Sequence, residues 1–139
     1  MPNWCTNELE IYGDKEKLKT FKGNVNSKQN KTSLCLEKLC PIKRDGVFDN
    51  YTISDIWGTK WNVEADCNDM AEQLGMLTYR FDSAWSPPRG AILTGSKKYP
   101  SLRFILRYDE PGMQYAGIFM CQNGKIVKDE CIDSNWPEE

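Results

Sequence analysis

Short stretches in which apolar and polar residues alternate recur along the 139-residue sequence, and they constrain the fold more than any motif. In the first, Cys5, Asn7, Leu9 and Ile11 fall on one side and polar or amphipathic residues on the other. A period of two residues is typical of a strand with one buried face. The predicted strands cover residues 4–12, 59–66, 77–85, 102–108, 113–121 and 125–132.

Two helices are predicted between these strands. Asp14 is placed to cap a helix that carries Leu18, Phe21 and Val25 on one face. The segment Ser86-Pro87-Pro88 predicts a second helix, capped by Ser86 and continuing to about residue 98.

A long connection separates the first helix from the second strand. We expect residues 24–52 to form a variable insert, with a short apolar element at 34–39 and a helical turn at 53–57 following. Residues 1–134 are therefore interpreted as one domain, and residues 135–139 as a loose tail.

The order strand–helix–strand–strand–helix–strand predicts an α+β fold, the ferredoxin-like βαββαβ sandwich. Right-handed crossovers make the first two strands parallel to each other and antiparallel to the third and fourth, in the sheet order 4-1-3-2. Asn123-Gly124 predicts a tight hairpin that joins two further strands beside the fourth. We expect an antiparallel sheet, extended by this C-terminal hairpin, with both helices on one face.

This topology brings aromatic and charged residues from distant segments to one end of the sheet. The starts of the first two strands and the ends of the next two share that end, so four of the five tryptophans converge there. The candidate site residues are Trp4, Trp57, Lys60, Trp61, Trp85, Arg89, Tyr108 and Glu110.

The same segments carry a resemblance to a known family. The motifs at residues 1–5 with Asn7, at 57–61, at 84–88 and at 108–112 resemble the YubB ferredoxin-like family of bacteriophages, prophages and conjugative plasmids. The resemblance implies a ferredoxin-like fold and a mobile-element origin. It implies no reaction and no catalytic residues.

Composition narrows the classes of function. A formal net charge of −2 argues against general coating of nucleic acid, which needs a basic face, although it leaves a local basic patch open. There is no apolar run near 18 residues and no signal-peptide pattern, so we expect a cytoplasmic protein that does not contact membranes. The six cysteines come without a histidine, which excludes Cys/His metal sites and Cys–His nucleophiles. We expect reduced thiols and no cofactor or metal.

The sequence favours a non-catalytic binding module in a bacterial cell. In the most specific version, Trp61 and Trp85 flank a pocket into which Lys60 and Arg89 project, and the ligand is a small anion such as a nucleotide. In another version, an exposed aromatic residue docks and inhibits a host protein, so that Trp57→Ala would abolish binding and leave the fold intact. A nucleic-acid accessory role and a purely structural tryptophan cluster stay open. An enzyme without histidine would depend on carboxylates for acid–base chemistry, or on Cys5 as an unassisted nucleophile. The candidate carboxylates are Glu110, Asp109, Asp82 and Glu64.

Overall fold

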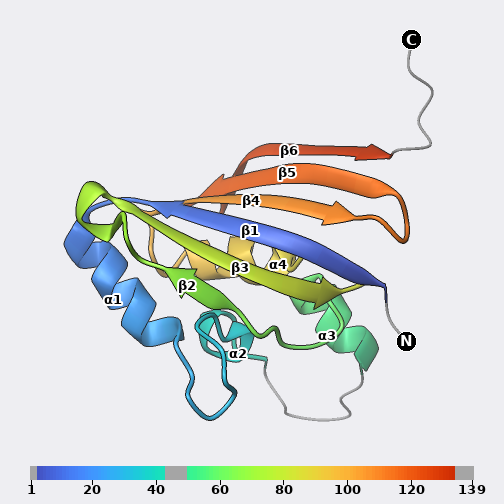
Figure 1. Cartoon of the computed structure of the whole chain (residues 1–139), viewed down its shortest axis with the longest axis horizontal. Helices are drawn as coiled ribbons and strands as arrows, with labels where there is room; N and C mark the ends of the chain where they lie inside the picture. Colours follow the sequence, from blue (N-terminus) through green and yellow to red (C-terminus); the bar gives the residue numbers. More distant parts are fainter. Residues whose placement is uncertain (1–2, 43–49, 134–139) are drawn as a thin grey trace.

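A computed structural model describes residues 3–42 and 50–133, and Figure 1 shows the sheet as one layer with the helices below it. The sheet is six-stranded, antiparallel and ordered β2-β3-β1-β4-β5-β6, which confirms the expected ferredoxin-like order and the hairpin extension. The elements are β1 (Trp4–Tyr12), α1 (Lys15–Val25), α2 (Leu36–Leu39), α3 (Asn50–Trp57), β2 (Asp66–Asn68), the 3₁₀ helix η1 (Glu72–Leu74), β3 (Met76–Ala84), α4 (Arg89–Ser96), β4 (Arg103–Glu110), β5 (Tyr115–Gln122) and β6 (Lys125–Asp133).

The alternation in β1 places the core as predicted. Cys5, Asn7, Leu9 and Ile11 are buried on the helix side, and the residues between them lie on the other face, which the described helices leave open. The neighbouring strands β3 and β4 continue both faces, because a residue and its cross-strand partner point to the same side. The sheet thus has one covered face and one open face.

Helix α1 begins where the sequence predicts. The Asp14 carboxylate accepts the backbone N–H groups of Glu16 and Lys17, at 3.1 and 3.4 Å, which satisfies donors that a helix start leaves unpaired. Leu18, Phe21 and Val25 are fully buried against the sheet.

The second strand is shorter and later than predicted. Residues 59–65 are not a strand, and β2 begins only at Asp66. Their backbone does not pair with β3. The Ala65 N–H donates to Thr32 Oγ1 in the α1–α2 connection, and Asn62 Oδ1 accepts the N–H of Leu36 at the start of α2. The segment from residue 58 to residue 65 is therefore a loop, which we call the tryptophan loop.

The second predicted helix is also displaced. Helix α4 runs only from Arg89 to Ser96 and has Pro88 at its N-cap, without a side-chain cap. Ser86 does not cap it, because its hydroxyl donates to the Gly58 carbonyl and holds the tryptophan loop.

The remaining predictions have mixed outcomes. At the β5–β6 turn, Asn123 and Gly124 have φ of +51° and +72°, as a tight hairpin turn requires, which confirms that prediction. Residues 34–39 contribute Leu34, Leu36 and Leu39 to the core, and the helical turn expected at 53–57 is confirmed as the last part of α3. The middle of the insert (residues 43–49) and the predicted loose tail (135–139) lie outside the described residues.

Candidate functional site

A buried polar network fixes the end of the sheet where the tryptophans gather. Asn7 Nδ2 donates to Ser83 Oγ at 2.8 Å and to the Cys5 carbonyl at 3.0 Å. The Ser83 hydroxyl in turn donates to the Ser86 carbonyl at 2.7 Å. With the bond from Ser86 to Gly58, this chain of bonds connects β1 and β3 to the tryptophan loop.

Glycines let the backbones of this region approach one another. Gly58 has φ +87°, a conformation that side chains disfavour, and an added Cβ would lie 3.0 Å from the Pro87 carbonyl. At Gly90, an added Cβ would lie 2.2 Å from the Ile56 carbonyl, which explains why α3 and α4 pack so closely. The tryptophan loop is thus held by close backbone contacts as well as hydrogen bonds.

Trp57 belongs to the core. Its side chain is 4% exposed, and its Nε1–H donates to the Cys40 carbonyl at 2.8 Å. It cannot provide an exposed contact for a partner, because the ring is buried and its N–H ties α3 to the C-terminal end of α2. The burial of Trp57 argues against the expectation that Trp57→Ala leaves the fold intact, and we now expect this variant to be destabilised.

Trp4 and Trp61 form the exposed aromatic pair. Their ring centroids are 6.2 Å apart in an edge-to-face arrangement, and the side chains are 45% and 39% exposed. Lys60 lies across the Trp61 ring, with Nζ 5.4 Å from the centroid. The predicted strand over residues 59–66 would have pointed Lys60 and Trp61 in opposite directions. These side chains converge because the segment is a loop and β2 begins only at Asp66.

Trp85 and Arg89 lie apart from this pair. Trp85 has φ +70°, its N–H donates to the Asn3 carbonyl, and its own carbonyl accepts the Tyr115 hydroxyl. The Arg89 guanidinium pairs with Asp129 of β6 at 3.3 Å. Neither residue lines the hollow beside Trp61, so the predicted arrangement of Trp61 and Trp85 around Lys60 and Arg89 is not the one in the structure.

Tyr108 and Glu110 are both buried on β4. Burial raises the pKa of the Tyr108 hydroxyl, and a contact with Cys131 adds to the shift. The Glu110 carboxylate accepts the backbone N–H groups of Gly112 and Met113 at 2.8 and 2.9 Å. Glu110 therefore shapes the β4–β5 turn.

Cys5 does not provide a ready nucleophile. Burial raises the pKa of its thiol to about 12, offset in part by a hydrogen bond with Ser83. It is protonated at neutral pH. All six cysteines are free, as predicted.

The hollow beside the aromatic pair has a volume of about 340 Å³. Its lining residues combine the two rings with two carboxylates: Trp4, Trp61, Asn62, Val63, Glu64 and Asp82. It adjoins a larger hollow of about 580 Å³ on the open face of the sheet, which shares Glu64 and Asp82 with it. The two form one continuous surface, which we call the open-face groove.

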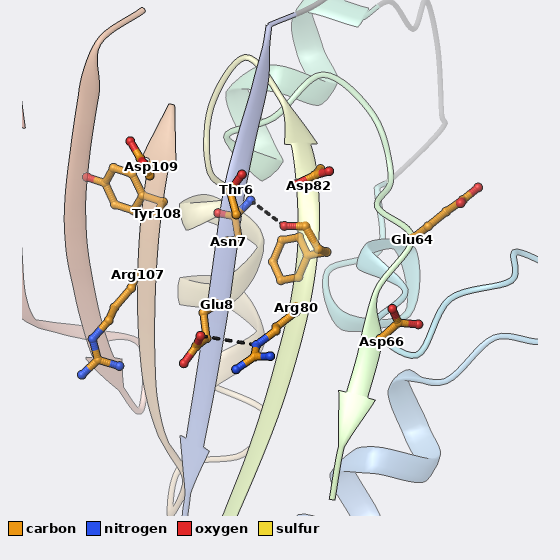
Figure 2. Close-up of a pocket in the computed structure, with 11 residues that line it drawn as sticks. Thr6, Asn7, Glu8, Glu64, Asp66, Arg80, Asp82, Arg107, Tyr108 and Asp109 are labelled. Carbon is orange, nitrogen blue, oxygen red and sulfur yellow. Dashed lines mark hydrogen bonds and ion pairs between the residues drawn. The ribbon is translucent and has the colours of Figure 1, made fainter. Parts of the chain in front are cut away.

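Charged residues cover the open-face groove in rows across the strands (Figure 2). Asp82, Thr6 and Asp109 lie side by side on β3, β1 and β4. In the next row, Arg80 pairs with Glu8 at 3.4 Å, and Arg107 pairs with Glu10. Both arginines are thus neutralised by their neighbours.

Four carboxylates of the groove have no cation. In the part of the chain that the structure describes, Glu64, Asp66, Asp82 and Asp109 form no ion pair. The groove is acidic next to an exposed aromatic pair. The sequence alone indicates Glu64, Asp82 and Asp109 only as possible acid–base groups, and it does not predict that they lie together. The strand register, which makes them neighbours, is the missing step.

No group of three or more cysteine, aspartate or glutamate residues is arranged to hold a metal ion in residues 3–42 and 50–133. Within the same ranges, no helix is long and apolar enough to cross a membrane.

Comparison with known proteins shows the family to which the chain belongs. Residues 57–138, more than half of it, match the family described as the ferredoxin-like domain in Api92-like protein. The chain belongs to this family. The crystal structure of protein api92 from Yersinia pseudotuberculosis is similar, with a TM-score of 0.70 and 10% sequence identity over 94% of this chain and 98% of that one. At this identity the likeness shows the fold alone. No curated protein matches the chain.

The match to the Api92-like family includes most of the groove. It takes in the tryptophan loop, β3 and β4, whereas Trp4 and the rest of β1 precede it. Of the aromatic pair, Trp61 therefore lies inside the matched region and Trp4 lies outside it.

Proposed function

We propose that this protein is a non-catalytic binding module whose open-face groove holds a positively charged segment of a partner protein. The observation that carries the proposal is the hollow between Trp4 and Trp61, where two exposed rings meet the carboxylates of Glu64 and Asp82. Aromatic faces attract lysine and arginine side chains, and carboxylates form charge-assisted hydrogen bonds with them.

The rest of the groove supports a segment longer than one residue. Asp66 and Asp109 add unpaired carboxylates along the open face, and Arg80 and Arg107 are already neutralised. A basic segment that crosses β3, β1 and β4 would place cations opposite these carboxylates. The groove would repel an acidic segment and the backbone of a nucleic acid.

The source of the segment is also part of the proposal. The resemblance to phage and plasmid proteins supports a role inside the bacterial cytoplasm, with a host protein as the partner and interference with host defence as the purpose. The four motifs that carry this resemblance include both Trp4 and Trp61.

A nucleotide-like anion is a second candidate for the same end of the sheet. Lys60 over the Trp61 ring favours it, because a base could stack on the ring while a phosphate pairs with the ammonium. Glu64 and Asp82 count against it, since both carboxylates line the hollow.

Calorimetric titration separates the two candidates. The ligands are an arginine- and lysine-containing peptide, the same peptide with glutamine at each basic position, and a panel of mono-, di- and cyclic nucleotides. We expect only the basic peptide to bind, and to bind more weakly as the salt concentration rises. Binding of a nucleotide alone would favour the second candidate, and binding of none of these ligands would refute both.

Matched variants locate the site. Asp82→Asn keeps the shape and removes the charge, so it should lower affinity roughly 3- to 10-fold, a value reduced for an exposed carboxylate. Trp61→Ala should lower it further. The controls are Glu16→Gln on α1 and Trp85→Ala, which lie outside the hollow. If the control variants lost as much affinity for the basic peptide, the binding site would not lie in the hollow.

A further inference from the structure

The outer edge of the sheet at β6 has no described neighbour. β6 pairs with β5 on one side, its other edge is free of every described element in Figure 1, and all nine of its residues are exposed. Ile126, Val127 and Ile132 are 54%, 53% and 70% exposed, which is unusual for large apolar side chains on one short strand. The unpaired N–H and C=O groups of such an edge are a template for another strand.

The sequence of β6 is complementary to itself. In an antiparallel pair of two copies centred on Asp129, Lys128 of each copy faces Glu130 of the other. A two-fold axis makes every such contact twice. Lys128 and Glu130 lie on the open face, opposite Met120 and Ile118 of β5, so both ion pairs form on the same side of the joined sheet.

Like charges at the centre of this pairing are already compensated. Asp129 would face Asp129 of the second copy, but each pairs with Arg89 of its own chain at 3.3 Å. The axis would therefore carry two neutral pairs instead of two bare carboxylates.

From this complementarity we propose that β6 is a dimerisation edge, whose partner is the β6 strand of a second copy of this chain. Lysines and bulges on an edge usually prevent pairing with other strands, and β6 has both, including a bulge opposite Met120 and Cys121. Lys128 already contacts Glu130 of its own chain, at 3.8 Å. In the Asp129-centred register it gains a second acidic partner from the other copy, whereas an unrelated strand would offer no such match. The bulge ends the regular pairing near Lys128, so the dimer is weak and depends on the Lys128–Glu130 contacts.

Charge exchange tests the interface by sedimentation equilibrium over a concentration series. The wild-type protein should dimerise, and Lys128→Glu or Glu130→Lys should weaken the dimer about 10- to 50-fold, because each change replaces two attractive cross-strand pairs with two repulsive ones. The double variant Lys128→Glu/Glu130→Lys should recover the wild-type constant. Lys15→Glu on α1 is the matched control and should leave it unchanged.

A disulfide tests the register. On oxidation, Asp129→Cys/Cys131→Ser should form a covalent dimer through residue 129 of the second copy, and Cys131→Ser alone should not. A monomer at all concentrations up to millimolar would overturn the proposal. So would a dimer that ignores the charge exchanges, since another surface would then hold it.

Discussion

Replacing Asn7 with alanine tests whether the buried polar network supports the tryptophan loop. Asn7 is 1% exposed, and its amide donates to Ser83 Oγ at 2.8 Å, to the Cys5 carbonyl at 3.0 Å and to the Phe81 carbonyl at 3.4 Å. An amide nitrogen carries two hydrogens, so the two shorter bonds dominate.

The structure sets the size of the effect. Two buried hydrogen bonds contribute about 1 kcal/mol each, and the cavity left by the missing amide adds a further cost. Asn7→Ala should therefore lower the free energy of unfolding by about 2–3 kcal/mol. For a domain of this size the melting temperature should fall by roughly 6–12 °C.

Urea denaturation of four proteins measures the effect and its origin. Asn7→Ala, Ser83→Ala, the double variant and the wild type form a double-mutant cycle, and the coupling energy should be about 1 kcal/mol, the worth of the bond between the two side chains. A loss below about 0.5 kcal/mol for Asn7→Ala, the range of ordinary surface changes, would refute the role of the network. A coupling near zero would refute the bond.

Three further predictions concern the core. Trp57→Phe removes the N–H and should lower the free energy of unfolding by about 1–2 kcal/mol, and Trp57→Ala by about 3–5 kcal/mol, both by urea denaturation. Gly90→Ala should cost about 1–3 kcal/mol because its Cβ meets the Ile56 carbonyl, whereas Gly23→Ala, whose Cβ meets nothing within 4 Å, should be neutral or stabilising; equal effects would contradict the close contact. The buried thiol of Cys5 should make the protein less stable at alkaline pH. Folding raises the pKa of this thiol from 9.0 to about 12, so the thiol ionises more readily in the unfolded protein. The free energy of unfolding should therefore fall as the pH rises from 9 to 12. In Cys5→Ala the free energy of unfolding should fall less over this pH range. An unchanged dependence on pH would mean that other groups cause the loss of stability.

The fold followed from the sequence where burial is periodic. β1 and β4 alternate along their whole length, and β3 alternates from Tyr79 to Ser83, so their positions and faces could be predicted. The second strand could not, because residues 59–65 alternate equally well yet bond to Thr32 and Leu36, partners 26 to 33 residues away. A pattern of period two does not tell a strand from a loop whose hydrogen bonds lie elsewhere.

The site was predicted to the level of segments but not of side chains. Topology alone brought Trp4 and Trp61 to one end of the sheet. The partner of Arg89, however, is Asp129, 40 residues away on a strand outside the ferredoxin-like core pattern. The acidity of the groove depends on which arginines are neutralised, and that follows from the register of β1 with β3 and β4 rather than from composition.

The two proposals are independent because of where their surfaces lie. The hollow at Trp4 is next to β1, and β1 is separated from β6 by β4 and β5, so a charge exchange on β6 should leave the affinity for one basic segment unchanged.

In the dimer the two open faces would form one continuous surface, with the β1 strands seven strand spacings apart, roughly 34 Å. The two-fold axis reverses the strand direction, so the two aromatic pairs would lie at opposite ends of the joined sheet, further apart than that. A single short segment cannot reach both hollows. Dimerisation would therefore strengthen binding only for a partner that presents two basic segments, and only if the chain between them can span this distance.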